Sequence, residues 1–169
     1  GQPEKYKIYE KSCDWAITNK NKDGKIIVSK TNIETGGRSF GLSFYEEGIV
    51  CSSPQTYDFS EKTVYYDLAY SKRIDSLRIL PGETNYSFYE GTPSFSSDNQ
   101  RLFYSGNATE VVKYREKKVK RKNIPISEEG VNILHIYEAK KKNGLWVREN
   151  PLAFNSKDYD CVFPHLTSN

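Results

Sequence analysis

The sequence predicts an all-β protein, because one short phrase recurs along the chain. The phrase has a small or Pro-led start, an aromatic residue or Leu, a polar turn, and a run of β-forming residues. It occupies residues 41–53 and 92–106, and its opening returns at 163–169. Tyr and Phe are abundant, Met is absent, and no stretch keeps a 3.6-residue apolar period. A hairpin pattern that recurs at intervals of tens of residues favours a propeller or a solenoid.

Residues 1–36 are expected to form short strands followed by a linker. Residues 6–9 alternate as a strand does, and residues 14–17 are expected to form another. No apolar stretch here is long enough to be read as a membrane span.

A polar run at residues 19–24 has the spacing of the start of a calcium-binding loop. Such a loop needs a bidentate Glu six residues after its Gly, and Lys30 stands at that position. A cation there would repel calcium. We therefore expect a hairpin turn at Asp23 and Gly24, followed by a strand over residues 25–29.

The repeat divides the rest of the chain into a first blade at 37–91, a second blade at 92–162 and the start of a third at 163–169. Ala69 and Ala139 take matching places in the two extended segments that follow the phrases. Four short antiparallel strands in each repeat are typical of a propeller blade. The second blade carries an insertion at about 107–131. A propeller closes with about four or more blades, so we expect the chain to be an incomplete propeller, a piece of a longer polypeptide.

The second phrase also carries a family resemblance. Residues 92–99 followed by 102–105 resemble the P-x-F-S-x-D-G and L-Y-F-x-S signature of TolB-type propeller repeats, with Asn99 as a left-handed substitute for the Gly. Residues 133–139, 143–146 and 152–159 are similar to the propeller segment of outer-membrane-associated OmpA-family proteins of Bacteroidota.

The resemblance covers roughly residues 30–169 and implies a cell-envelope protein. Proteins of this family join such a propeller to a peptidoglycan-binding domain, and one branch serves type IX secretion and gliding. The resemblance therefore implies a periplasmic, outer-membrane-associated scaffold whose partners are envelope proteins. Peptidoglycan would be reached only through a domain that this chain does not contain.

The charge of the chain is concentrated in one run. Residues 113–122 hold seven basic residues and Glu116, a local net charge of +6 within a chain of +3, which leaves −3 elsewhere. A solvated hairpin is the simplest interpretation, and a surface for an acidic partner is the functional one. Nucleic acid is not expected, because Tyr114 is the run's one aromatic for base stacking. The candidate partner surface is Lys113, Arg115, Lys117, Lys118, Lys120, Arg121 and Lys122.

The three cysteines have no C-x-x-C spacing, which argues against a zinc or redox motif. Cys51 is expected to be a small core residue in a strand. A Cys13–Cys161 or a Cys51–Cys161 bridge would suit a periplasmic protein. His135 is expected to be hydrogen-bonded within a strand, and His165 to have a structural polar role rather than to bind metal.

No catalytic motif is present: the chain has no G-x-S-x-G elbow, no H-E-x-x-H and no phosphate-binding Gly-rich loop. We therefore expect a non-catalytic module without cofactor or metal. The alternative is the accessory propeller of a hydrolase, either a serine oligopeptidase or a carbohydrate-active enzyme. Asp67 and Glu138 are the nearest approach to recurring carboxylates, and they fall one place apart. Self-association or a second fragment could complete the third blade.

Overall fold

The computed structural model describes residues 3–19, 33, 38–58, 63–72, 76–86, 89–107 and 132–167. The chain divides into two units, residues 1–30 and residues 31–169, each of which is described by itself. The turn expected at Asp23 and Gly24, the strand expected at 25–29 and the basic run at 113–122 lie outside the described residues.

The first unit contains helix α1, Pro3–Asn19, so the strands expected at 6–9 and 14–17 are wrong. The alternation over a few residues was misleading, because apolar residues at 6, 9, 13 and 16 also recur at helical spacing. Pro3 stands at the first helical position, where its missing N–H costs nothing. At the other end, the Asn19 side chain donates to the Trp15 carbonyl at 2.7 Å.

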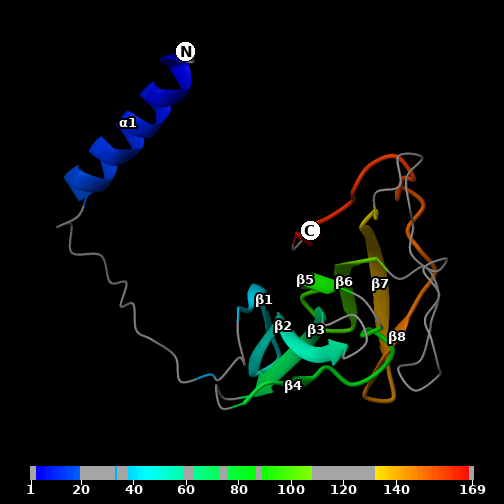
Figure 1. Ribbon diagram of the computed structural model, residues 1–169. Helices are drawn as coiled ribbons and strands as arrows, with labels where there is room; N and C mark the ends of the chain where they lie inside the picture. The colour runs from blue at the N-terminus through cyan, green and yellow to red at the C-terminus, as the bar shows by residue number, and fades with distance from the viewer. Residues whose placement is uncertain are drawn as a thin grey trace. The chain divides into compact units, whose positions relative to one another are not determined.

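The second unit is built from two four-stranded antiparallel sheets, each with its strands in sequence order (Figure 1). The all-β expectation is therefore confirmed for the described part of residues 31–169. Sheet 1 consists of β1 (Phe40–Tyr45), β2 (Gly48–Asp58), β3 (Thr63–Lys72) and β4 (Arg78–Ile79). Sheet 2 consists of β5 (Glu90–Phe95), β6 (Arg101–Gly106), β7 (His135–Lys142) and β8 (Leu145–Arg148).

The recurring phrase has the same backbone signature in all three copies. Gly41, Thr92 and Phe163, which hold the same position of the phrase, have φ values of 62°, 42° and 56°. In sheets 1 and 2 the ladder shifts register at this point, between Phe40 and Ser43 and between Gly91 and Ser94. Positive φ is uncommon in Thr and Phe, so this shared kink is a structural property of the repeat and not of one glycine.

The strand pairing also fixes which residues of the two sheets are equivalent. Cys51 pairs with Ala69 in sheet 1, and at the same register Tyr104 pairs with Tyr137 in sheet 2. Ala69 is therefore equivalent to Tyr137, and its expected match with Ala139 is wrong by two residues. The shift of two keeps the same face of the strand, so the sequence pattern alone did not reveal it.

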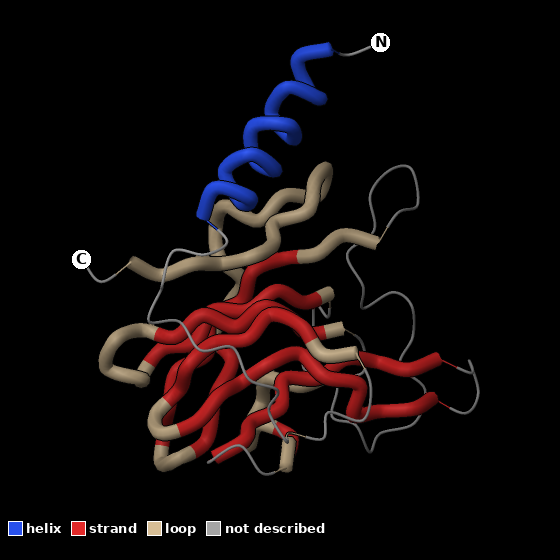
Figure 2. Tube along the Cα trace, turned by 90° about the vertical axis from the view of Figure 1, so that its left-hand side faces the viewer, coloured by secondary structure: helices blue, strands red, loops and turns tan. Residues whose placement is uncertain are grey.

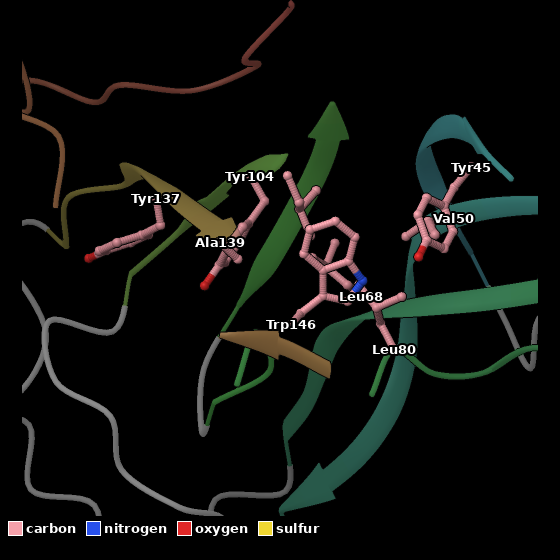
Figure 3. Packing of buried hydrophobic residues seen from close by; sticks show 9 residues of the cluster. Tyr45, Val50, Leu68, Leu80, Tyr104, Tyr137, Ala139 and Trp146 are labelled. Atoms are coloured by element: carbon pink, nitrogen blue, oxygen red, sulfur yellow. The ribbon is translucent and has the colours of Figure 1, made fainter. Parts of the chain in front are cut away.

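The core lies between the sheets, where one face of sheet 1 packs on one face of sheet 2. Trp146 of β8 is almost completely buried and lies in the middle of the apolar cluster (Figure 3). The Phe95 ring stacks on Tyr45 with centroids 4.5 Å apart, and both rings lie within 6 Å of Trp146. The other fully or nearly buried members are Val50, Leu68, Leu80, Leu102, Tyr104, Tyr137 and Ala139.

The segment after β4 ties the two sheets together by its backbone. The Trp146 N–H donates to the Pro81 carbonyl at 3.1 Å, and the Glu83 N–H donates to the Trp146 carbonyl at 2.6 Å. Gly82 lies between them with φ at 123°, and a Cβ there would stand 2.1 Å from the Trp146 carbonyl oxygen. A side chain at position 82 would therefore separate this segment from β8. The strands of both sheets form one body in Figure 2.

Candidate functional site: a cavity where the three phrases converge

A cavity of about 120 Å³ lies where the starts of the three phrases meet. Phe40, Gly91 and Val162 each stand one residue before a copy of the phrase, and each lines the cavity. A Cβ at position 91 would stand 3.1 Å from the Phe40 ring, so a side chain there would need that ring to shift by a few tenths of an ångström. The remaining lining residues are Tyr89, Glu90, Thr92, Ser105, Leu134 and Phe163.

Hydrogen bonds of the polar groups around the cavity hold its wall together. The Thr92 and Ser105 hydroxyls are 3.0 Å apart, and the Phe163 N–H donates to the Ser105 Oγ at 3.1 Å. The Ser52 hydroxyl donates to the Glu90 carbonyl at 2.6 Å. Because these groups already bond one another, the surface offered to a ligand is mainly apolar.

Aromatic side chains form the exposed rim. Phe163 is 71 % exposed, and Phe40 and Tyr89 are partly exposed, at 49 % and 40 %. Tyr66 links them, with ring centroids 5.3 Å from Phe40 and 6.3 Å from Tyr89. Solvent-accessible aromatics around a hollow are the usual anchors for an apolar side chain of a partner.

Glu90, which lines the cavity, has its side chain almost completely buried. Burial raises the pKa of its carboxyl well above the ordinary value, and the nearby Asp67 carboxylate adds to the effect. The Tyr86 backbone N–H and Arg148 act in the opposite sense but do not outweigh burial. Within the described residues, neither Glu90 carboxyl oxygen makes a hydrogen bond of regular geometry. The buried Glu90 carboxyl is therefore harder to ionise than an exposed one.

Three aromatic hydroxyls and one cation accompany Glu90 between the sheets. The Arg148 guanidinium lies 3.5 Å from the centroid of the Tyr137 ring and 4.9 Å from that of Tyr86. Burial raises the pKa of Tyr86 to about 12 and raises the pKa of Tyr104 well above its ordinary value. These tyrosines therefore stay protonated near neutral pH.

All three cysteines and both histidines lie among the described residues. All three cysteines are free, and the expected Cys51–Cys161 bridge within the second unit does not form in the structure. Cys51 is a buried residue of β2, as expected, and burial raises the pKa of its thiol. His135 of β7 lies 2.7 Å from the Ser156 carbonyl through its Nε2, whereas His165 is exposed.

The structure does not bring the two carboxylates considered for sugar chemistry to equivalent places. Asp67 pairs with Ser53 and is buried, whereas Glu138 pairs with Phe103 and binds Arg101 at 2.7 Å. Across the described ranges, no three His, Cys, Asp or Glu side chains converge as metal ligands do.

Sequence reasoning did not single out Phe40, Tyr89 or Phe163 as site residues. The usable signal was the alignment of the phrases, because the residues at 40, 91 and 162 precede the same kink. The expected partner surface at 113–122 lies outside the described residues.

In comparisons with known proteins, no family model, no curated protein and no solved structure matches the chain. In the parts of the chain that the structure describes, no helix has both the length and the apolar character needed to cross a bilayer.

Proposed function

We propose that the chain is a non-catalytic, protein-binding scaffold module made of propeller-type blades. The observation that carries the proposal is the cavity at the convergence of three equivalent phrase starts. In a propeller the innermost strands of successive blades surround a common channel, and ligands bind at its mouth. Two meandering four-stranded sheets whose first strands share a kink at Gly41 and Thr92 support this architecture, and the same kink recurs at Phe163.

The ligand that fits this site best is an apolar side chain of a partner protein. The rim is aromatic, the Ser105 and Thr92 hydroxyls bond each other, and the Ser105 hydroxyl also accepts from the Phe163 N–H. A sugar needs several free hydrogen-bonding partners in addition to a stacking ring, so the accessory propeller of a carbohydrate-active hydrolase is the second candidate. The aromatic rim is the observation that favours it.

The resemblance to OmpA-family propeller segments supports a place in the cell envelope. On this proposal the module is periplasmic and outer-membrane-associated, and it docks envelope proteins of a secretion or gliding complex. Attachment to peptidoglycan would need a separate domain. The proposed role of the chain is to position partners and not to transform a substrate.

A binding measurement on rim variants tests the proposal. Peptides selected from a displayed random library against the chain would be compared with an oligosaccharide array. Tyr89→Ser is expected to weaken peptide binding at least about tenfold, because it removes an aromatic anchor. Phe154→Ser is the matched control, since Phe154 is exposed but does not line the cavity. Selective binding of sugars, lost in Tyr89→Ser, would favour the second candidate instead.

A further inference from the structure

The cavity at the starts of the three phrases has a volume that restricts what enters it. That volume is about 120 Å³. An engineered, enclosed apolar cavity of about 150 Å³ stays dry and binds benzene. The present cavity is smaller than that one, so it holds less than a benzene ring. A Leu or Ile side chain, which is smaller than such a ring, matches the available space.

The cavity is open to solvent on the side of its rim, where Phe40, Tyr89 and Phe163 are partly exposed. An enclosed cavity can hold only a free molecule, whereas an open one also admits a group that stays attached to a chain outside. A side chain of a partner can therefore enter while its backbone lies across the rim. The rim rings would then shield the anchoring residue from water.

The polar groups in the wall are already engaged. The Ser105 Oγ accepts from the Phe163 N–H at 3.1 Å and lies 3.0 Å from the Thr92 Oγ1. The Ser52 hydroxyl donates to the Glu90 carbonyl at 2.6 Å. A charged or amide side chain placed here would lose its hydration and find few partners, which opposes its binding. An aliphatic side chain carries no such cost.

Leu134 offers a way to change the size of the cavity. It lines the cavity, and its backbone is held on both sides. The Leu134 N–H donates to the Asp160 Oδ1 at 2.8 Å, and the Leu134 carbonyl accepts from the Cys161 N–H at 2.8 Å. Because these bonds involve only the Leu134 backbone, a shorter side chain there enlarges the cavity and leaves the bonds in place.

We propose that the cavity is a size-selective pocket for one Leu or Ile side chain of the partner protein. The inference rests on the proposed function, because it names the anchoring residue at that same site. Val would leave part of the cavity unfilled, whereas Phe or Trp would require its wall to move. The pocket therefore selects by size among apolar residues and not only by apolar character.

Capped single amino acids test the pocket on the full chain. The probes are the N-acetyl amides of valine, leucine, phenylalanine and tryptophan, with methyl glucoside as the sugar. Their binding is followed through the methyl resonances of Leu134 and Val162 in NMR spectra. The leucine compound is expected to bind about fourfold more tightly than the valine compound, because it buries one more methylene. The two aromatic compounds should bind at least about fivefold more weakly than the leucine compound, because overfilling strains the wall.

Leu134→Ala is expected to reverse this order, so that the phenylalanine compound binds better than the leucine compound, as followed through the Val162 methyls. Leu145→Ala is the matched control, because Leu145 is 52 % exposed and does not line the cavity. That control should keep the order of the parent. The inference is overturned by equal binding of the leucine and phenylalanine compounds to the parent, or by saturable binding of methyl glucoside at these methyls. A folded Leu134→Ala that keeps the parental order also overturns it. The series on the parent is decisive even where Leu134→Ala does not fold.

Failure of the pocket and failure of the proposed function give different results. Peptide binding that is lost in Tyr89→Ser, together with equal binding of the leucine and phenylalanine compounds, would keep the proposed function and refute the size selection. Selective binding of the leucine compound without binding of any peptide would keep the size selection and refute the docking role.

Discussion

The Asn85 side chain bonds both backbone polar groups of Leu68. The Leu68 N–H donates to the Asn85 Oδ1 at 2.7 Å, and the Asn85 Nδ2 donates to the Leu68 carbonyl at 3.0 Å. In sheet 2, Asn155 holds Ile136 by the same two bonds, each at 2.8 Å. Leu68 and Ile136 are equivalent residues of β3 and β7. A side-chain amide thus takes the place of a neighbouring strand at the same point of each repeat.

Replacing Asn85 by Ala is expected to lower the free energy of unfolding by about 1–3 kcal/mol, because the Leu68 N–H of a buried strand loses its acceptor, whereas the Leu68 carbonyl keeps its bond from the Leu80 N–H. Asn85→Asp keeps an acceptor but loses the donor, so an intermediate loss is expected. Urea denaturation measures both effects. Asn150→Ala is the control, since Asn150 is exposed. A loss for Asn85→Ala no larger than that control would contradict the interpretation.

The sequence predicted local features better than contacts that bring distant segments together. Asn99 was expected to replace a turn glycine, and its φ of 55° confirms this. The bonds of Asn85 to Leu68 were not expected. They depend on the chain returning to Leu68, 17 residues earlier, and no local pattern encodes that return.

The candidate site was missed for the same reason. Phe40 and Phe163 come together only when the phrases stack, whereas the charged run at 113–122 is conspicuous in the sequence by itself. The error in residues 3–19 was local: a few alternating residues were given more weight than helical spacing and the position of Pro3.

Gly41 is expected to be intolerant of a side chain for two separate reasons. Its φ is 62°, and a Cβ would stand 2.8 Å from the Thr92 Cα of the next phrase. Gly144, in the turn between β7 and β8, has φ at 79° but nothing within 4 Å of an added Cβ. Gly144→Ala should therefore lower the free energy of unfolding by about 1–2 kcal/mol from backbone strain alone. Gly41→Ala should lower it by more.

Chemical denaturation measures the free energy of unfolding of the two alanine variants. The difference between their losses reports the steric contact between phrases 1 and 2. Equal losses would show that β1 moves away from Thr92 without cost. Adding Thr92→Gly to Gly41→Ala is expected to recover part of the lost stability, because a glycine adopts the positive φ of residue 92 without strain.

Ser105 is expected to hold the third phrase in place. Its hydroxyl accepts from the Phe163 N–H at 3.1 Å and contacts Thr92. Ser105→Ala should therefore speed hydrogen exchange of the Phe163 amide, whereas Ser94→Ala should act first on the Leu166 amide. Exchange measured by mass spectrometry on both variants separates the two contacts. Unchanged exchange at residue 163 in Ser105→Ala would show that this bond does not hold the segment.

Glu90 is expected to make the protein less stable as pH rises. Burial, with Asp67 nearby, raises the pKa of its carboxyl well above 4.5 in the folded state, whereas the unfolded chain ionises near 4.5. Between these two values the folded state holds a proton that the unfolded state has released. The stability linked to this proton is fully present below the unfolded pKa and is lost as pH rises toward the folded pKa.

Glu90→Gln keeps the shape of the side chain and removes the titration. The variant is therefore expected to be more stable than the parent at pH 7, by about 1.4 kcal/mol for each unit of pKa shift. The advantage should disappear below about pH 4.5, where the parent carboxyl is protonated in both states. Urea denaturation from acidic to neutral pH measures the difference in free energy of unfolding between Glu90→Gln and the parent. Glu149→Gln is the control with the opposite sign, because a hydrogen bond from Lys142 lowers the Glu149 pKa. A stability difference between Glu90→Gln and the parent that stays constant with pH would refute a raised pKa for the buried Glu90.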